Sequence, residues 1–130
     1  MSRRVALALG CLVATSALGC EKETERYAGL RFDVVSAAPI PARLESDLVE
    51  LPAGVAVFTS VIPRSSEKPY TRRDVLSLRA EDPEVLDVFS GTDPFDFVLV
   101  GLAPGRTCLR VTINRSEKEC IDVRVEEQPE

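Results

Sequence analysis

The sequence predicts an all-β protein, a sandwich of about seven short strands. Beyond residue 29 the apolar residues mostly alternate with polar ones, which is the period of a strand with one buried face. Turn formers, chiefly proline, glycine and aspartate, separate these runs at short intervals. No long segment here has convincing helical spacing, so the strands must bury their apolar faces against one another in two layers.

The first half of this region contains two clear strands and one ambiguous segment. Residues 30–34 alternate apolar and polar side chains until two prolines interrupt the pattern. Residues 44–51 are ambiguous, because three leucines have helical spacing whereas the last four residues suit a short strand. Residues 55–62 are rich in β-branched and aromatic side chains and predict a strand, which a polar loop at 63–73 follows.

The second half alternates strands with short turns. The strand pattern recurs, in order, at residues 75–78, 85–89, 95–100, 107–113 and 120–125. The turns that precede the last two strands are marked by Asp-Pro at residues 82–83 and 93–94 and by Pro-Gly at residues 104–105. The last two strands flank six polar turn formers and are expected to form a hairpin.

This hairpin is expected to hold a disulfide. Centred on Asn114, it places Cys108 opposite Cys120. The core face is then formed by Leu109, Val111, Ile113, Ile121, Val123 and Val125, and the outer face by the two cysteines with Arg110, Thr112 and Asp122. Two remaining thiols in an exported chain favour a bridge. A metal pair lacks support, because the chain has no histidine and the cysteine spacing is not that of ligands.

The first twenty residues predict export. Two arginines precede an apolar run at residues 5–18, which is too short to cross a membrane and has the layout of a secretory signal. The run ends in Ala-Leu-Gly-Cys at residues 17–20, and this stretch resembles a bacterial lipobox. The resemblance implies that residues 1–19 are a signal peptide and that Cys20 is lipidated. The alternative is an ordinary signal peptide cut elsewhere, with Cys20 a simple thiol.

The rest of the organisation follows from composition. Residues 20–29 would form the lipidated cysteine and a polar tether, residues 30–126 the sandwich, and residues 127–130 a tail.

Loss of the two signal arginines changes the formal net charge from −5 to −7. An acidic chain without basic stripes argues against binding to nucleic acid and against electrostatic binding to anionic lipid. The protein would therefore be attached to the membrane through its acyl chains alone. Glu21 in place of the aspartate of inner-membrane lipoproteins implies, by the same resemblance, an outer membrane facing the periplasm.

Four segments together resemble bacterial Ig-like domains of group 2: residues 48–63 (LVELPAGVAVFTSVIP), 77–91 (SLRAEDPEVLDVFSG), 100–113 (VGLAPGRTCLRVTI) and 120–125 (CIDVRV). The resemblance implies an Ig-like arrangement of the sandwich. The tryptophan usual in that family is missing, so Leu76 or Leu78 must fill its core position. Residues 30–41 precede the family's usual start and predict an extra edge strand or a strap.

Few residues suggest chemistry. No histidine is available as a base beside a nucleophile, no cofactor motif is present, and we expect no enzyme. Acidic turns at residues 81–87 and 93–96 lack the ligand spacing of a calcium loop and are read as a solvated rim. The candidate binding loop is the one basic loop, with Arg64, Lys68, Tyr70, Arg72 and Arg73. The alternative is a plain solvated loop.

Two functions are therefore compared. The favoured one is a non-catalytic, envelope-anchored lipoprotein whose Ig-like module contacts another envelope protein or a cell-wall polymer through a strand edge or the basic loop. The alternative is a regulatory subunit or inhibitor of a periplasmic enzyme.

Overall fold

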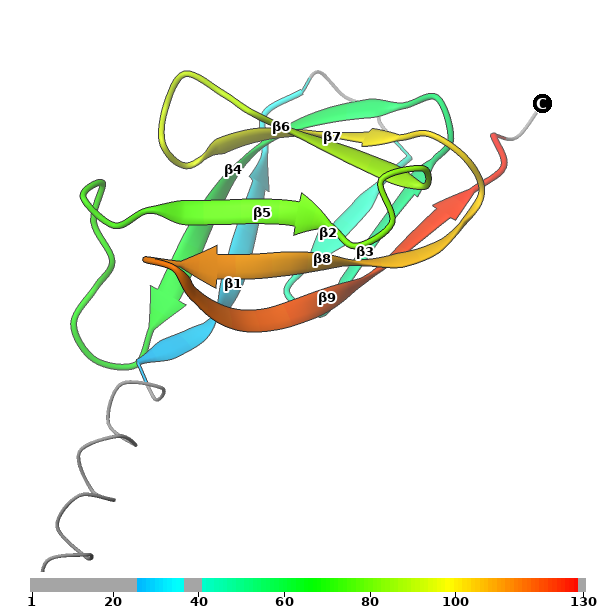
Figure 1. Cartoon of the computed structure of the whole chain (residues 1–130). Helices are drawn as coiled ribbons and strands as arrows, with labels where there is room; N and C mark the ends of the chain where they lie inside the picture. The colour runs from blue at the N-terminus through cyan, green and yellow to red at the C-terminus, as the bar shows by residue number, and fades with distance from the viewer. Residues whose placement is uncertain (1–25, 37–40, 129–130) are drawn as a thin grey trace, which may run out of the picture.

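The computed structural model of the chain describes residues 26–36 and 41–128, which form nine strands in two packed sheets. The strands are β1 (Tyr27–Val34), β2 (Arg43–Glu45), β3 (Leu48–Pro52), β4 (Ala56–Ser65), β5 (Leu76–Ala80), β6 (Leu86–Ser90), β7 (Asp96–Gly101), β8 (Gly105–Ile113) and β9 (Ser116–Glu126). In Figure 1, β6 and β7 of one sheet lie above β5 and β8 of the other. The described residues include no helix long and apolar enough to cross a membrane.

Hydrogen bonding fixes the order of strands in each sheet. Sheet 1 has the order β1-β4-β7-β6 and is antiparallel throughout. Sheet 2 has the order β2-β3-β9-β8-β5, and its β3–β9 pair is parallel. The predicted all-β class is therefore confirmed, with nine strands in place of about seven.

The ambiguous segment at 44–51 belongs to β2 and β3. The parallel ladder sets Val49 beside Val123 and Leu51 beside Val125, and both β3 side chains are buried. A helix of two turns is marginal by itself. Backbone pairing with β9 and the burial of these side chains therefore decide in favour of strands.

The core lies between the inner faces of the two sheets. The alternating side chains that we expected inside β8 and β9 are all buried. Val57 is fully buried, whereas Val55 precedes β4 and is half-buried, although it still packs against the core. Leu76 and Leu78 are both buried, and the two of them occupy the core from β5.

The predicted disulfide between Cys108 and Cys120 forms, but the hairpin register differs from the prediction by two residues. Cys108 pairs across the ladder with Asp122, and Arg110 pairs with Cys120. The cysteines are therefore diagonal neighbours, with their Cα atoms 5.3 Å apart. Because the shift is an even number of residues, both cysteines keep the outer face.

A β-bulge makes this register possible. The turn consists of Asn114 and Arg115, whose φ angles of 52° and 70° are the left-handed values that a two-residue hairpin turn requires. A two-residue turn without a bulge would set Cys108 opposite a core side chain of β9. Lys118 is the extra residue, since Val111 pairs with Glu119 whereas the next residue along β8 pairs with Glu117. The bulge restores the parity that buries the apolar faces.

Two predicted boundaries are wrong. β1 begins at Tyr27, inside the expected tether 20–29, because Tyr27 pairs with Ser65 and its hydroxyl donates to a Glu119 carboxylate oxygen at 2.5 Å. Burial, reinforced by this hydrogen bond, raises the pKa of Tyr27 above its ordinary value of 10.0. β4 continues through the buried Pro63 to Ser65, so Arg64 lies in a strand. The signal peptide and Cys20 lie outside the described residues.

Candidate binding surfaces

The candidate binding loop, predicted at residues 63–73, lies in the structure at residues 66–75 between β4 and β5, and Asp74 closes it. The Thr71 amide donates to Asp74 Oδ2 at 2.7 Å, and the Asp74 amide donates to the Thr71 carbonyl at 2.9 Å. The side-chain amide of Asn114, in the β8–β9 turn, donates to Asp74 Oδ1 at 3.0 Å. The hydrogen bonds from Asn114 and from Thr71 hold the pKa of Asp74 below its ordinary value of 3.8.

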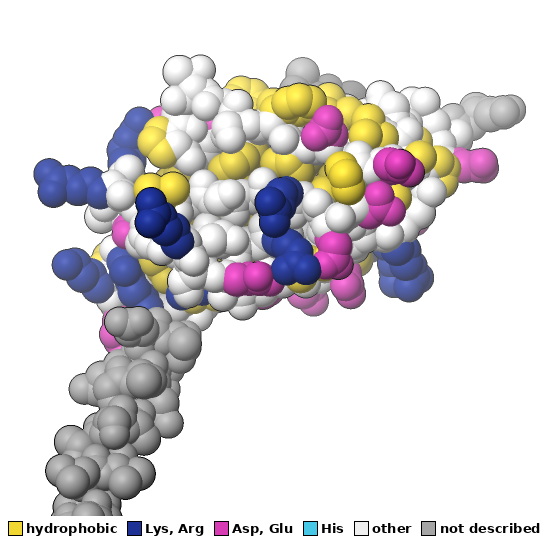
Figure 2. Space-filling view, in the orientation of Figure 1, with side chains coloured by type: hydrophobic (Ala, Val, Ile, Leu, Met, Phe, Trp, Pro, Cys, Tyr) yellow, Lys and Arg dark blue, Asp and Glu magenta, His cyan; other side chains and the backbone are white. Residues whose placement is uncertain are grey.

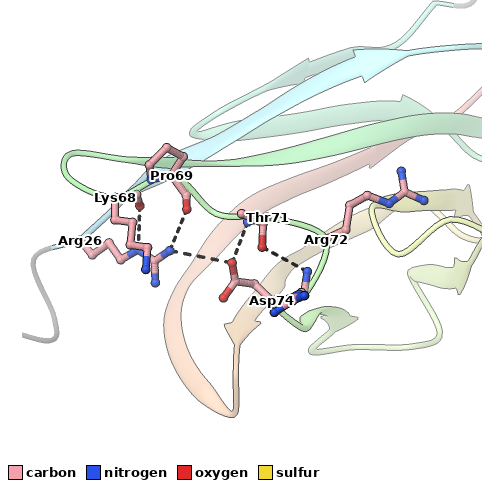
Figure 3. Close-up of a pocket in the computed structure, with 7 residues that line it drawn as sticks. Arg26, Lys68, Pro69, Thr71, Arg72 and Asp74 are labelled. Carbon is pink, nitrogen blue, oxygen red and sulfur yellow. Dashed lines mark hydrogen bonds and ion pairs between the residues drawn. The ribbon is translucent and has the colours of Figure 1, made fainter.

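Arg26, directly before β1, fastens the other half of this loop. Its Nε donates to the Lys68 carbonyl at 2.9 Å, and its Nη2 donates to the Pro69 carbonyl at 3.0 Å. The guanidinium carbon lies 3.9 Å from the centroid of the Tyr70 ring. Figure 3 shows the bonds of Arg26 to the loop carbonyls and to Asp74, whose Oδ2 lies 3.8 Å from Nη2. The start of the domain and the loop therefore form one unit.

A hollow of about 770 Å³ opens in this unit, lined by Arg26, Lys68, Pro69, Thr71, Arg72, Arg73 and Asp74. Arg26 is occupied by the loop carbonyls, and Arg72 pairs with Asp93 at 2.6 Å. Lys68 and Arg73 are exposed and make no ion pair within residues 26–36 and 41–128. The hollow therefore presents a surplus of positive charge to solvent.

The predicted loop residues divide into three groups. Lys68, Arg72 and Arg73 do line one hollow. Tyr70 is half-buried beneath Arg26 and packs against the core, so it supports the loop and is not a free contact residue. Arg64 lies at the end of β4 and does not line the hollow.

The sequence analysis missed two residues that organise this site. Arg26 was assigned to the tether, and its long-range bonds have no local signal. Asp74 follows the predicted loop, but its spacing from Thr71 is a recognisable turn pattern that could have found it.

Charge is segregated between the two ends of the sandwich. The end where β1 begins gathers cations from three segments of the chain: Arg26, Arg64, Lys68, Arg72, Arg73 and Arg115. We call this the basic end. Its carboxylates are Glu67, Asp74 and Asp93, with Glu117 near the β8–β9 turn and Glu119, which accepts the Tyr27 hydroxyl. The opposite end, where β5 and β9 finish, carries Asp82, Glu84, Glu126 and Glu127 with Arg106 and its ladder partner Arg124. In Figure 2 several dark blue side chains gather at the basic end, and others lie in the middle of the face and at its far side. The acidic net charge of the sequence therefore conceals a modest local excess of positive charge at the basic end.

The acidic turns have internal roles. Asp82 Oδ1 accepts the Glu84 amide at 3.0 Å, and Asp93 Oδ1 accepts the Phe95 amide at 3.2 Å. A carboxylate oxygen of Glu81 and the sulfurs of Cys108 and Cys120 lie within 4.8 Å of one another, a spacing that could suit a metal ion. Its carboxylate pairs with Arg110, and sulfurs joined in a disulfide are not thiolate ligands. These carboxylates thus serve turns and ion pairs.

A second surface is a row of apolar side chains on the outer face of sheet 1. Phe58 pairs with Val98, and Val98 pairs with Phe89. Val35, just after β1, extends the row because its amide donates to the Phe58 carbonyl at 2.8 Å. Val35, Phe58 and Phe89 are 57%, 39% and 51% exposed. Figure 2 shows hydrophobic side chains gathered over β6 and β7. We call Val35, Phe58, Val98 and Phe89 the apolar row.

Sequence reasoning overlooked the apolar row because it assigned an outer face only to the last two strands. Phe58 lies between the buried Val57 and Thr59, and this alternation alone places an aromatic ring outside. Which other outward residues stand beside it depends on the order β1-β4-β7-β6, and the sequence does not contain that order.

Comparison with known proteins gives a likeness of fold. No protein-family model and no curated protein sequence matches the chain. A structure of surface layer protein SbsC, domains 1–6, is similar with a TM-score of 0.56 and 13% identity, over 80% of this chain and 13% of that one. The crystal structure of domains 4 and 5 of the S-layer protein SbsC is similar with a TM-score of 0.52 and 13% identity, over 74% of this chain and 54% of that one. The chain therefore spans well under two thirds of either structure, and the likeness establishes a shared β-sandwich fold.

Proposed function

We propose that the protein is a non-catalytic lipoprotein of the bacterial envelope, anchored through Cys20 in an outer membrane and facing the periplasm. Its Ig-like module binds another envelope protein through the outer face of sheet 1. The proposal assigns no catalytic residue, and the chain has no histidine to act as a general base.

The apolar row is the observation that carries this proposal. Four neighbouring apolar side chains, two of them phenylalanine, run from the end of β1 across β4, β7 and β6; three are exposed and Val98 is half-buried between the phenylalanines. Protein contact surfaces have such an apolar centre, in which aromatic side chains provide much of the affinity, within a polar rim. The rim on this face contains Asp87 and Asp96, together with Asp33, which pairs with Arg31 on the same face at 2.9 Å. The partner is therefore a protein whose contact surface has an apolar centre and basic residues around it.

Two further observations support an envelope role. The disulfide between Cys108 and Cys120 suits an oxidising compartment outside the cytoplasm. Two solved structures that share the fold are of domains of the S-layer protein SbsC, which suggests by analogy a structural or binding module at the cell surface.

Photo-cross-linking in the intact envelope tests the partner. A photoreactive phenylalanine analogue at Phe89 should yield one dominant adduct with an envelope protein, whereas the same analogue at Ser77, exposed on the outer face of sheet 2, should not. Phe58→Ser should reduce the Phe89 adduct by roughly 10-fold. Equal adducts from both positions, or none, would refute the assigned face. A hydrolase as the dominant adduct would favour the inhibitor function.

Fractionation tests the anchor. Cys20→Ala should move the protein from the membrane fraction to the soluble fraction and abolish labelling by a fatty-acid analogue. Unchanged fractionation with no label in either form would mean that Cys20 carries no lipid.

A further inference from the structure

We propose that the basic end of the sandwich rests on the anionic headgroups of the membrane that holds the anchor. The inference rests on the proposed lipidation of Cys20. It assigns the hollow around Lys68 and Arg73 to phospholipid headgroups, and it leaves the apolar row free for the protein partner.

The length of the tether carries the first step. Six residues lead from Cys20 to Arg26, which is already bound to the loop at Lys68 and Pro69. Fully extended, they span about 20 Å. The eleven residues of β9 span roughly 36 Å, so the tether is shorter than the sandwich is long. The end at which the chain enters the domain must therefore stay near the membrane surface.

That end is the basic end. Arg26 lies at the entry point itself, and the β4–β5 loop and the β8–β9 turn are bonded to it through Asp74 (Figure 3). Lys68, Arg73, Arg64 and Arg115 are exposed cations that make no ion pair among the described residues. Such residues are attracted to an anionic surface once they lie within a Debye length of about 8–10 Å.

The opposite end strengthens the orientation. Asp82, Glu84, Glu126 and Glu127 lie where β5 and β9 finish and outnumber Arg106 and Arg124 there, so an anionic surface repels this end. The separated charges therefore turn the basic end towards the membrane and the acidic end away from it. In this orientation the faces of both sheets point sideways, where a neighbouring protein can reach the apolar row.

Neutron reflectometry on the lipidated protein, reconstituted in supported bilayers, tests this arrangement. With 30% phosphatidylglycerol in phosphatidylcholine at low salt, the water gap between bilayer and protein should nearly close. In pure phosphatidylcholine, or in 0.5 M NaCl, it should open towards the tether length of about 20 Å. The test variant is Lys68→Gln with Arg73→Gln, which should keep the gap open in anionic lipid. The matched control, Arg79→Gln with Arg106→Gln, removes the same charge from exposed positions on sheet 2 and should leave it closed.

Each other outcome overturns the inference. An equal gap in neutral and anionic bilayers would show that headgroup charge does not hold the domain. Equal loss of contact in both double variants would show that the net charge of the domain, and not the basic end, holds it to the bilayer. Binding of a soluble acidic cell-wall polymer with an open gap in anionic lipid would assign the hollow to that polymer. The mass of the N-terminal peptide, recorded on the same sample, shows separately whether Cys20 carries lipid.

Discussion

Asn114 joins the β8–β9 turn to the basic loop, and its replacement should reveal two separate contributions to stability. Its side chain accepts the Val75 amide at 2.9 Å and donates to Asp74 at 3.0 Å, and its φ is 52°. Loss of two hydrogen bonds of this kind costs about 1–2 kcal/mol. A left-handed φ costs an alanine about 1 kcal/mol more, whereas glycine adopts it freely.

Asn114→Ala should therefore lower the free energy of unfolding by about 2–3 kcal/mol, and Asn114→Gly by about 1–2 kcal/mol. Urea denaturation with the disulfide intact measures both, and an unchanged m-value would show that the denatured state is unaffected. Amide exchange gives a local check, because exchange at Val75 should accelerate in both variants. Gly101, whose amide donates to the Val55 carbonyl at 3.0 Å in another part of the fold, is the reference.

The alanine and glycine variants separate the two terms. Equal losses in both would mean that the φ at this position carries no cost. No loss in the glycine variant, with Val75 exchange unchanged, would mean that the side-chain bonds do not hold the loop.

Three further predictions concern the core, the bridge and the loop. Val111→Ala, fully buried in β8, should cost about 1–3 kcal/mol in denaturant, whereas the neighbouring Thr112→Ala should cost less than about 0.5 kcal/mol; the reverse order would mean that the strand faces are misassigned. Replacing Cys108 and Cys120 together with alanine should cost about 2–4 kcal/mol and leave the far-ultraviolet circular dichroism unchanged, unless alkylation finds free thiols in the native protein. Because hydrogen bonding lowers the folded-state pKa of Asp74, its stabilisation of the loop is complete above pH 3.8 and is lost as the pH falls through the lower folded-state value. The protection factor of the Thr71 amide should decline over that acid range, and a flat profile would contradict the role of Asp74.

The strand pattern and the side-chain faces could be read from the sequence because both depend on neighbouring residues. Alternation in residues 107–113 and 120–125 identified six core side chains, all of which are buried. The disulfide followed from the same parity, even though the register was wrong. An error of two residues preserves the face of every side chain, so a correct pairing of Cys108 with Cys120 survived a wrong centre of the hairpin.

The candidate surfaces were within reach of the sequence only in part. It pointed to Lys68, Arg72 and Arg73 as one basic loop, since they are close along the chain. It assigned Tyr70 to the contact surface, because nothing in the sequence near Tyr70 indicates that Arg26, directly before β1, covers its ring. Contacts of this kind join residues more than forty positions apart.

The sequence by itself therefore determined the fold class, the inward and outward faces of most strands and the bridge between Cys108 and Cys120. Only the tertiary structure decided the strand order, the bulge at Lys118, the union of Arg26 with the basic loop and the apolar row across sheet 1. The physical reason is the range of the interactions. Polarity with a period of two is written along each strand, whereas the choice of neighbouring strands is made by the burial and hydrogen bonding of the whole chain at once.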